Sequence, residues 1–186
     1  MLFLKSSIAQ NQNLSFEVWK NNILIGNISI SENINDDFVI YDLSSEIKTK
    51  VLLEFNITGI EKTIYNHGVL VYSSVYRKIN SNEKTNKELF FKDGIYYLLK
   101  SGKKSALTFP EIKSNLITLY FYEPLNIAQV YCDNHNKMVQ VVFVEKGKYQ
   151  VNFPDGSYNI FYYENGKCLK VDALGLLYEV QLISAI

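Results

Sequence analysis

The sequence has few of the residues on which metal and nucleic-acid sites depend. It contains two histidines, and neither lies in an HxxxH or HExxH spacing, so a metal ion would lack ligands at useful positions. Its 19 basic and 19 acidic residues cancel. Nucleic-acid binding draws most of its affinity from excess positive charge at the phosphates. We therefore expect no metal, no cofactor and no nucleic-acid partner.

Long apolar runs are also missing. No stretch approaches the roughly 20 apolar residues of a membrane-spanning helix, so we expect no transmembrane segment. The first residues, MLFLKSSIAQ, resemble the tail of a secretory signal peptide cleaved after Ala9, although the apolar part is short and Lys5 interrupts it. We interpret residues 1–9 as the remnant of a longer signal peptide and residues 10–186 as a single antiparallel β domain, in a periplasmic or secreted protein. The alternative is a frayed terminus.

Catalytic motifs are absent from the sequence. It contains no GxSxG, GxxxxGK[ST] or GxGxxG pattern. His67 and His135 lie in turn-forming stretches, where histidines are usually solvated. We therefore expect a protein that is not an enzyme and assign no catalytic residue.

Only two cysteines are present, Cys132 and Cys168. Export would allow a disulfide between them. Both lie in strand-like sequence, so two separate half-buried thiols are the other interpretation. The spacing alone does not decide between these two.

What the sequence does have is tyrosine and phenylalanine. There are 14 Tyr and 11 Phe beside one Trp and three Pro. These residues favour pleated, half-buried surfaces. They also suit apolar pockets with a polar end.

Hairpin signals and alternation predict strands throughout the chain. Pairs such as Asp93-Gly94 and Asn165-Gly166 favour tight turns, and between the turns apolar and polar side chains alternate, as in Val51–Thr58. This is typical of an antiparallel meander, and its long strands must curl or close to hide an apolar face. The predicted strands are 14–20, 23–31, 37–48, 50–64, 69–79, 86–92, 95–100, 127–132, 138–145, 148–153, 157–163, 168–172 and 177–184.

One segment, TFPEIKSNLITLYFYEP from Thr108 to Pro124, departs from this pattern. Thr108 and Glu111 fit a capping box, and Ile112, Leu116 and Leu119 would share a helical face. We predict a helix at about 109–122 that is apolar almost all round and therefore buried on more than one side. The composition of 116–122 would also allow a strand.

The order of several stretches resembles a family of exported bacterial proteins of unknown function, which is similar to the half-barrels of periplasmic lipoprotein carriers. These stretches are VWKNNILIG, YNHGVLVYSS, KDGIYYLL, IKSNLITLYFYEP and FPDGSYNIFYYENGKC, and the resemblance covers roughly residues 14–172. It implies a mainly β fold: a curved antiparallel sheet forming a half-open barrel with a helix across its concave face. It implies no catalytic residue. A closed lipocalin-like barrel and a β-sandwich are the alternative folds.

This arrangement would place part of the aromatic excess around a ligand. We expect a non-enzymatic protein that binds a lipid or another apolar small molecule in the concave face. The alternative is a structural or protein-interaction module of the cell envelope with a filled core, whose protein partner the sequence does not identify. The expected ligand-binding residues are Leu116, Leu119, Tyr120 and Phe121 on the helix, and Tyr158, Phe161 and Tyr162 on a strand.

Overall fold

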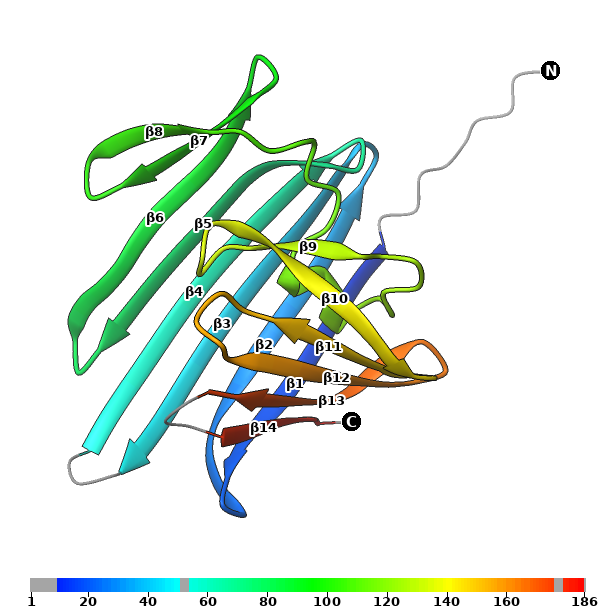
Figure 1. Ribbon diagram of the computed structural model, residues 1–186. Helices are drawn as coiled ribbons and strands as arrows, with labels where there is room; N and C mark the ends of the chain where they lie inside the picture. Colours follow the sequence, from blue (N-terminus) through cyan, green and yellow to red (C-terminus); the bar gives the residue numbers. More distant parts are fainter. Residues whose placement is uncertain (1–9, 51–53, 176–178, 186) are drawn as a thin grey trace.

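A computed structural model describes residues 10–50, 54–175 and 179–185, and in these ranges the chain forms one 14-stranded antiparallel sheet (Figure 1). The order across the sheet is β8-β7-β6-β5-β4-β3-β2-β1-β14-β13-β12-β11-β10-β9. The strands are β1 (Gln10–Lys20), β2 (Ile23–Asn35), β3 (Phe38–Lys50), β4 (Glu54–Asn66), β5 (Val69–Ile79), β6 (Asn82–Lys92), β7 (Ile95–Lys100), β8 (Lys103–Leu107), β9 (Gln129–Cys132), β10 (Lys137–Glu145), β11 (Lys148–Asn152), β12 (Tyr158–Glu164), β13 (Lys167–Leu174) and β14 (Glu179–Ser184).

The predicted meander is confirmed, because every pair of strands adjacent in the chain from β1 to β8 and from β9 to β14 is also paired in the sheet. Turns with two positive φ angles join many of them, such as Asn21-Asn22 at 50° and 62°. Asn and Gly tolerate this conformation, which suits the right-handed twist of the flanking strands. Strand β8 was not predicted. Its sequence KKSAL lies mostly exposed at the sheet edge, so it lacks the apolar alternation of a half-buried strand.

The predicted curvature is also confirmed, and the sheet is not closed into a barrel. In Figure 1 the short strands β9–β14 lie in front of the long strands β1–β5. The curl brings the turn after β9 to the face of β5, where the Ser73 hydroxyl donates a 2.6 Å hydrogen bond to Asp133. The described residues therefore support neither the closed barrel nor the two-layer sandwich.

The predicted helix at about 109–122 is wrong. Residues 108–128, here called the crossing segment, contain one short 3₁₀ turn, η1 (Leu116–Tyr120), and are otherwise extended or bent. Extended backbone lets the carbonyls of Ile112 and Ser114 accept hydrogen bonds from Leu70 and Tyr131 respectively, so the segment joins β5 to β9. The Thr118 hydroxyl bonds the Asn115 carbonyl at 2.7 Å, a local contact that competes with helix formation.

The crossing segment nonetheless occupies the predicted place. Its aromatic rings pack on residues of the concave face: Tyr120 lies against Phe16, and Phe121 against Tyr41. The 3₁₀ turn contributes Ile117 and Leu119 to the buried core. The core therefore sits between the concave face and this segment.

Candidate ligand site

A pocket of about 530 Å³ opens on the concave face beside the 3₁₀ turn. It lies near the end of the long strands where the β1–β2 and β3–β4 hairpins are, and side chains of these strands line it. This volume falls within the range of small-molecule sites. The aliphatic side chains that line it are Val18, Ile25, Ile28, Leu43, Ile47, Ile57, Leu116, Ile117 and Val180.

The strand pairing explains why these side chains meet. Residues directly opposite each other in an antiparallel sheet point to the same face. Ile28 pairs with Ser45, and Ser45 pairs with Gly59, so all three lie on the concave face. The pocket is therefore a direct consequence of the register of β2, β3 and β4.

Two charged residues form part of the same lining. Arg77 of β5 and Glu61 of β4 both line the pocket, and the Arg77 guanidinium donates a hydrogen bond to the Glu61 carboxylate. Arg77 pairs with Gly59 across the strands. A Cβ added to Gly59 would lie 2.7 Å from Ser45 Oγ, which is too close, and 3.7 Å from Arg77 Cγ, which is an ordinary contact, so the glycine makes room for the Ser45 side chain beside the arginine.

Tyr120 brings a hydroxyl to the pocket. Its ring is fixed by edge contacts to Phe16 and Phe161, with centroid distances of 5.1 and 5.7 Å. In the part of the chain that the structure describes, no residue forms a hydrogen bond with its hydroxyl, and burial raises its pKa above the usual value for tyrosine. The Tyr120 residue is half-buried, and its hydroxyl is not sealed inside the core. Tyr120 therefore offers a hydrogen bond to a bound molecule.

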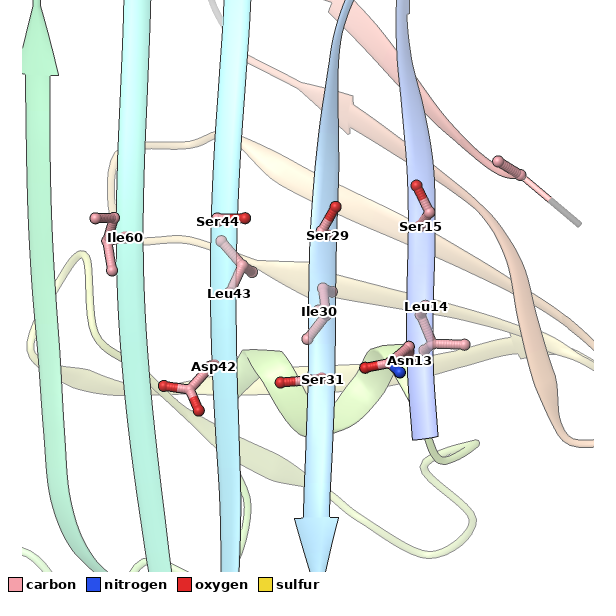
Figure 2. Close-up of a pocket in the computed structure, with 11 residues that line it drawn as sticks. Asn13, Leu14, Ser15, Ser29, Ile30, Ser31, Asp42, Leu43, Ser44 and Ile60 are labelled. Atoms are coloured by element: carbon pink, nitrogen blue, oxygen red, sulfur yellow. The ribbon is translucent and has the colours of Figure 1, made fainter. Parts of the chain in front are cut away.

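A second hollow, also of about 530 Å³, lies on the convex face (Figure 2). Its rim carries small hydroxyl side chains: Ser15 pairs with Ser29, and Ser29 pairs with Ser44. Ser29 and Ser44 are exposed, and Ser15 is half-buried. The hollow is lined by fewer aliphatic side chains than the concave pocket and is the poorer candidate; these side chains are Leu14, Ile30, Leu43 and Ile60.

A buried polar cluster holds the crossing segment against the sheet. The Asn115 amide donates to Thr63 at 3.1 Å and to Asp133 at 3.2 Å, and its carbonyl oxygen accepts from the Tyr65 hydroxyl at 3.1 Å. Burial raises the pKa of the Asp133 carboxyl to about 6, and the hydrogen bond from Ser73 only partly offsets this effect. The cluster positions η1 beside the pocket.

Lys87 extends this cluster to β6. Its ammonium group donates to the carbonyls of Asp133 and Asn134 and, at 2.9 Å, to the side chain of Asn136. Burial lowers its pKa from the usual lysine value. Lys87 thus ties the β9–β10 turn to the main wall of the sheet.

A second clamp lies at the other end of the crossing segment. Glu32 is 1% exposed and accepts hydrogen bonds at 2.7 Å from the hydroxyls of Tyr41 and Tyr122. Tyr41 pairs with Glu32 in the sheet, whereas Tyr122 follows η1. This contact anchors the C-terminal side of the turn.

The family described as a domain of unknown function (DUF6134) matches residues 16–184, nearly the whole chain. The chain belongs to this family. Neither the curated proteins nor the solved structures gave a match. The resemblance to a family of unknown function is therefore confirmed. Export and likeness to lipoprotein carriers stay predictions for this DUF6134 protein.

The structure separates the seven predicted ligand-binding residues into three groups. Leu116, Tyr120 and Phe161 line the concave pocket of the DUF6134 protein. Leu119 and Phe121 are buried in the core beside it. The last two, Tyr158 and Tyr162, lie on the opposite face of β12 from Phe161.

The surroundings of Tyr162 show this placement. Its hydroxyl donates to Asp172 at 2.9 Å, and the ammonium groups of Lys148 and Lys170 lie over its ring. Its neighbour Tyr163 points to the core, where its hydroxyl donates to the Leu119 carbonyl. The aromatic side chains on one face of β12 thus pack into the core, and those on the other face contact charged side chains.

Sequence reasoning missed most of the lining. Arg77, Glu61 and the aliphatic residues of β2–β4 were not singled out, because each looks like an ordinary member of an alternating strand. Gly59, a glycine inside a long strand, was the available signal, since such a glycine often marks a close approach by another group.

The two cysteines and the two histidines considered in the sequence lie outside the candidate site. Cys132 and Cys168 are both buried free thiols, so no disulfide joins them. His135 stacks on Phe153, and His67 Nδ1 lies 3.4 Å from Asp37 at the exposed surface. Within residues 10–50, 54–175 and 179–185, no group of three or more His, Cys, Asp or Glu could hold a metal ion, and no helix is long and apolar enough to cross a membrane. The interpretation of residues 1–9 as a signal remnant lies outside the described ranges.

Proposed function

We propose that this protein binds an apolar small molecule, such as a lipid or an alkyl chain, in the concave pocket, and that it acts by binding and not by catalysis. The observation that carries the proposal is a pocket of about 530 Å³ on the concave face of the sheet, lined mainly by aliphatic side chains. A filled core would be packed densely, with few voids larger than a water molecule.

The polar groups around the pocket support the same function. Ligand sites combine an apolar lining with a small number of polar groups that orient the ligand. Here Tyr120, Arg77 and Glu61 are such groups. Export to the periplasm or the medium belongs to the proposal as well, and its support is the N-terminal sequence alone.

A structural or protein-interaction role is the rival. It is favoured by the dense packing of Leu119 and Phe121, which are 1% and 6% exposed. In that case the pocket would hold only water.

Native mass spectrometry of the protein, purified without detergent from a bacterial host, tests the proposal. We expect a second species heavier than the chain, whose extra mass disappears on denaturation and is recovered in an organic extract. A stripped sample should take up a fluorescent fatty acid. A single mass equal to the chain, with no uptake of the probe, would contradict ligand binding and favour the structural role.

A further inference from the structure

We infer that the ligand is an amphipath with an anionic head group, a carboxylate in the simplest case, held at Arg77 and Tyr120 with its alkyl chain along the aliphatic floor. This inference rests on the proposed function and adds the chemical class of the ligand. It follows from the charges at one end of the concave pocket.

Arg77 has N–H donors that no described residue uses. A guanidinium carries five N–H donors in a fixed fork, and the described residues give Arg77 one hydrogen bond, to Glu61. Its side chain is 34% exposed, so it is reachable from the pocket that it lines. Arginine suits carboxylates because the two groups match in geometry.

Tyr120 supplies a second donor in the same pocket. Its hydroxyl has no hydrogen-bond partner among the described residues. Tyr120, Glu61 and Arg77 all line the same pocket. A carboxylate in contact with Arg77 would therefore share the pocket with a free hydroxyl donor.

Positive charge continues outward from Arg77 on the same face. Lys87 pairs directly with Lys100, and Lys100 pairs directly with Lys103, across β6, β7 and β8. Lys87 pairs with Val75, two residues before Arg77 on β5, which places Arg77 on the same face as this row. Like charges directly opposite in a sheet are destabilising, so a row of them needs another reason.

Negative groups near this row only partly neutralise it. The Glu61 carboxylate forms an ion pair with Arg77, and Asp133 lies close to Lys87. Lys100 and Lys103 are exposed and form no ion pair with any described residue. The row therefore keeps a positive potential beside the pocket, which attracts an anionic head group.

Lys20 is the competing cation, since it also lines the pocket. It lies on β1, and Arg77 lies on β5, four strand spacings or roughly 19 Å away along the sheet. The aliphatic side chains of β2, β3 and β4 lie between them. A single ligand thus has its head at one of two separated positions, and the row of lysines favours the Arg77 end.

Three ligands with the same alkyl chain test the inference: laurate, lauryl alcohol and lauryl trimethylammonium, measured by isothermal titration calorimetry. We expect laurate to bind at least about tenfold more tightly than the alcohol, the cation to bind most weakly, and Arg77→Gln to remove the preference for laurate. Glu61→Gln should strengthen the binding of laurate more than that of the alcohol, because it frees the guanidinium and removes a like charge.

Two further variants keep the result interpretable. The double variant Glu61→Gln/Arg77→Gln leaves no unpaired charge, so it separates a loss of binding from a loss of folding in Arg77→Gln. Lys20→Gln is the matched control and should keep the preference. Loss of the preference in Lys20→Gln instead, or equal binding of laurate and the alcohol with no effect of Arg77→Gln, would overturn the head-group inference while the proposed function stands. Failure of all three ligands to bind would contradict the proposed function itself.

Discussion

At the scale of single residues, the crossing segment depends on a few buried polar contacts. Asn115 reaches Thr63, Tyr65 and Asp133, so one side chain joins β4 to the β9–β10 turn. Each buried group has a partner, which is what such groups require. Removing one partner would leave the others unsatisfied at a cost of about 1–3 kcal/mol each.

Asp133 gives this cluster a pH dependence. Burial raises the pKa of its carboxyl to about 6 from an ordinary value of 3.8. The folded protein therefore binds more protons than the unfolded chain between these pH values. The stabilisation from protonated Asp133 is complete below about pH 4 and is lost as the pH rises through 6.

We predict that the stability of the wild type falls, relative to Asp133→Asn, by roughly 3 kcal/mol between pH 4 and pH 7. Urea unfolding at several pH values measures this difference. Asp42→Asn, which changes a carboxylate at the exposed surface, is the control and should not show it. Parallel pH profiles for wild type and Asp133→Asn would contradict the role of burial at Asp133.

At the scale of elements, the crossing segment contributes side chains both to the packed core and to the lining of the pocket. Phe121 is buried and packs on the Tyr41 ring at 5.3 Å, whereas Leu116 lines the pocket. The two side chains lie five residues apart in one short segment. Substitutions at these two positions therefore compare a densely packed site with one that is not filled.

We predict that Phe121→Ala lowers the free energy of unfolding by about 3–5 kcal/mol, because it removes buried contacts and leaves a cavity. Leu116→Ala should cost less than about 2 kcal/mol, because its neighbours are not fully packed around it. Chemical denaturation of both variants measures the difference. Equal large losses would show that the pocket is closed in solution.

Most of the strands were predictable from sequence, whereas β8 and the crossing segment were not. Alternation and Gly-containing turns depend on nearest neighbours in the chain, so β2, β5 and β12 were found with small errors at their ends. The segment from Thr108 to Pro124 carries a helical pattern of apolar residues, but its structure is decided by Leu70 and Tyr131, which lie far away in sequence. Tertiary hydrogen bonds of this kind override local propensity.

The site was predictable only in part for a similar reason. Tyr120 and Phe161 stood out as aromatic residues in aromatic stretches, and both line the pocket. Arg77 gave no local signal, because its position in the pocket depends on Gly59 and Glu61 on the neighbouring strand. Register across strands is not visible in one sequence.

At the scale of the whole molecule, the long strands set the curvature. Strands β1–β6 have 11 to 13 residues, whereas β9, β11 and β14 have four to six. The sheet curls over itself, and its short half covers only part of the concave face of its long half (Figure 1). The uncovered part holds the pocket.

The proposed export also concerns the whole chain. If Ala9 marks a cleavage site, the mature protein begins at Gln10. N-terminal sequencing of protein expressed with its upstream codons in its native host tests this prediction. An intact Met1 on protein recovered from the cytosol would contradict it.

The central claim is that the concave pocket, and not the convex hollow, holds the ligand. Two adjacent serines of β3 separate these sites: Ser45 lines the concave pocket, and Ser44 lies on the convex face (Figure 2). Both changes, Ser45→Trp and Ser44→Trp, add the same indole to the same strand. The most direct test is the affinity for laurate of the wild type and of these two variants. We predict that Ser45→Trp fills the pocket and lowers the affinity at least about tenfold, while Ser44→Trp binds like the wild type. Unchanged binding by Ser45→Trp, or loss of binding in Ser44→Trp alone, would contradict the claim.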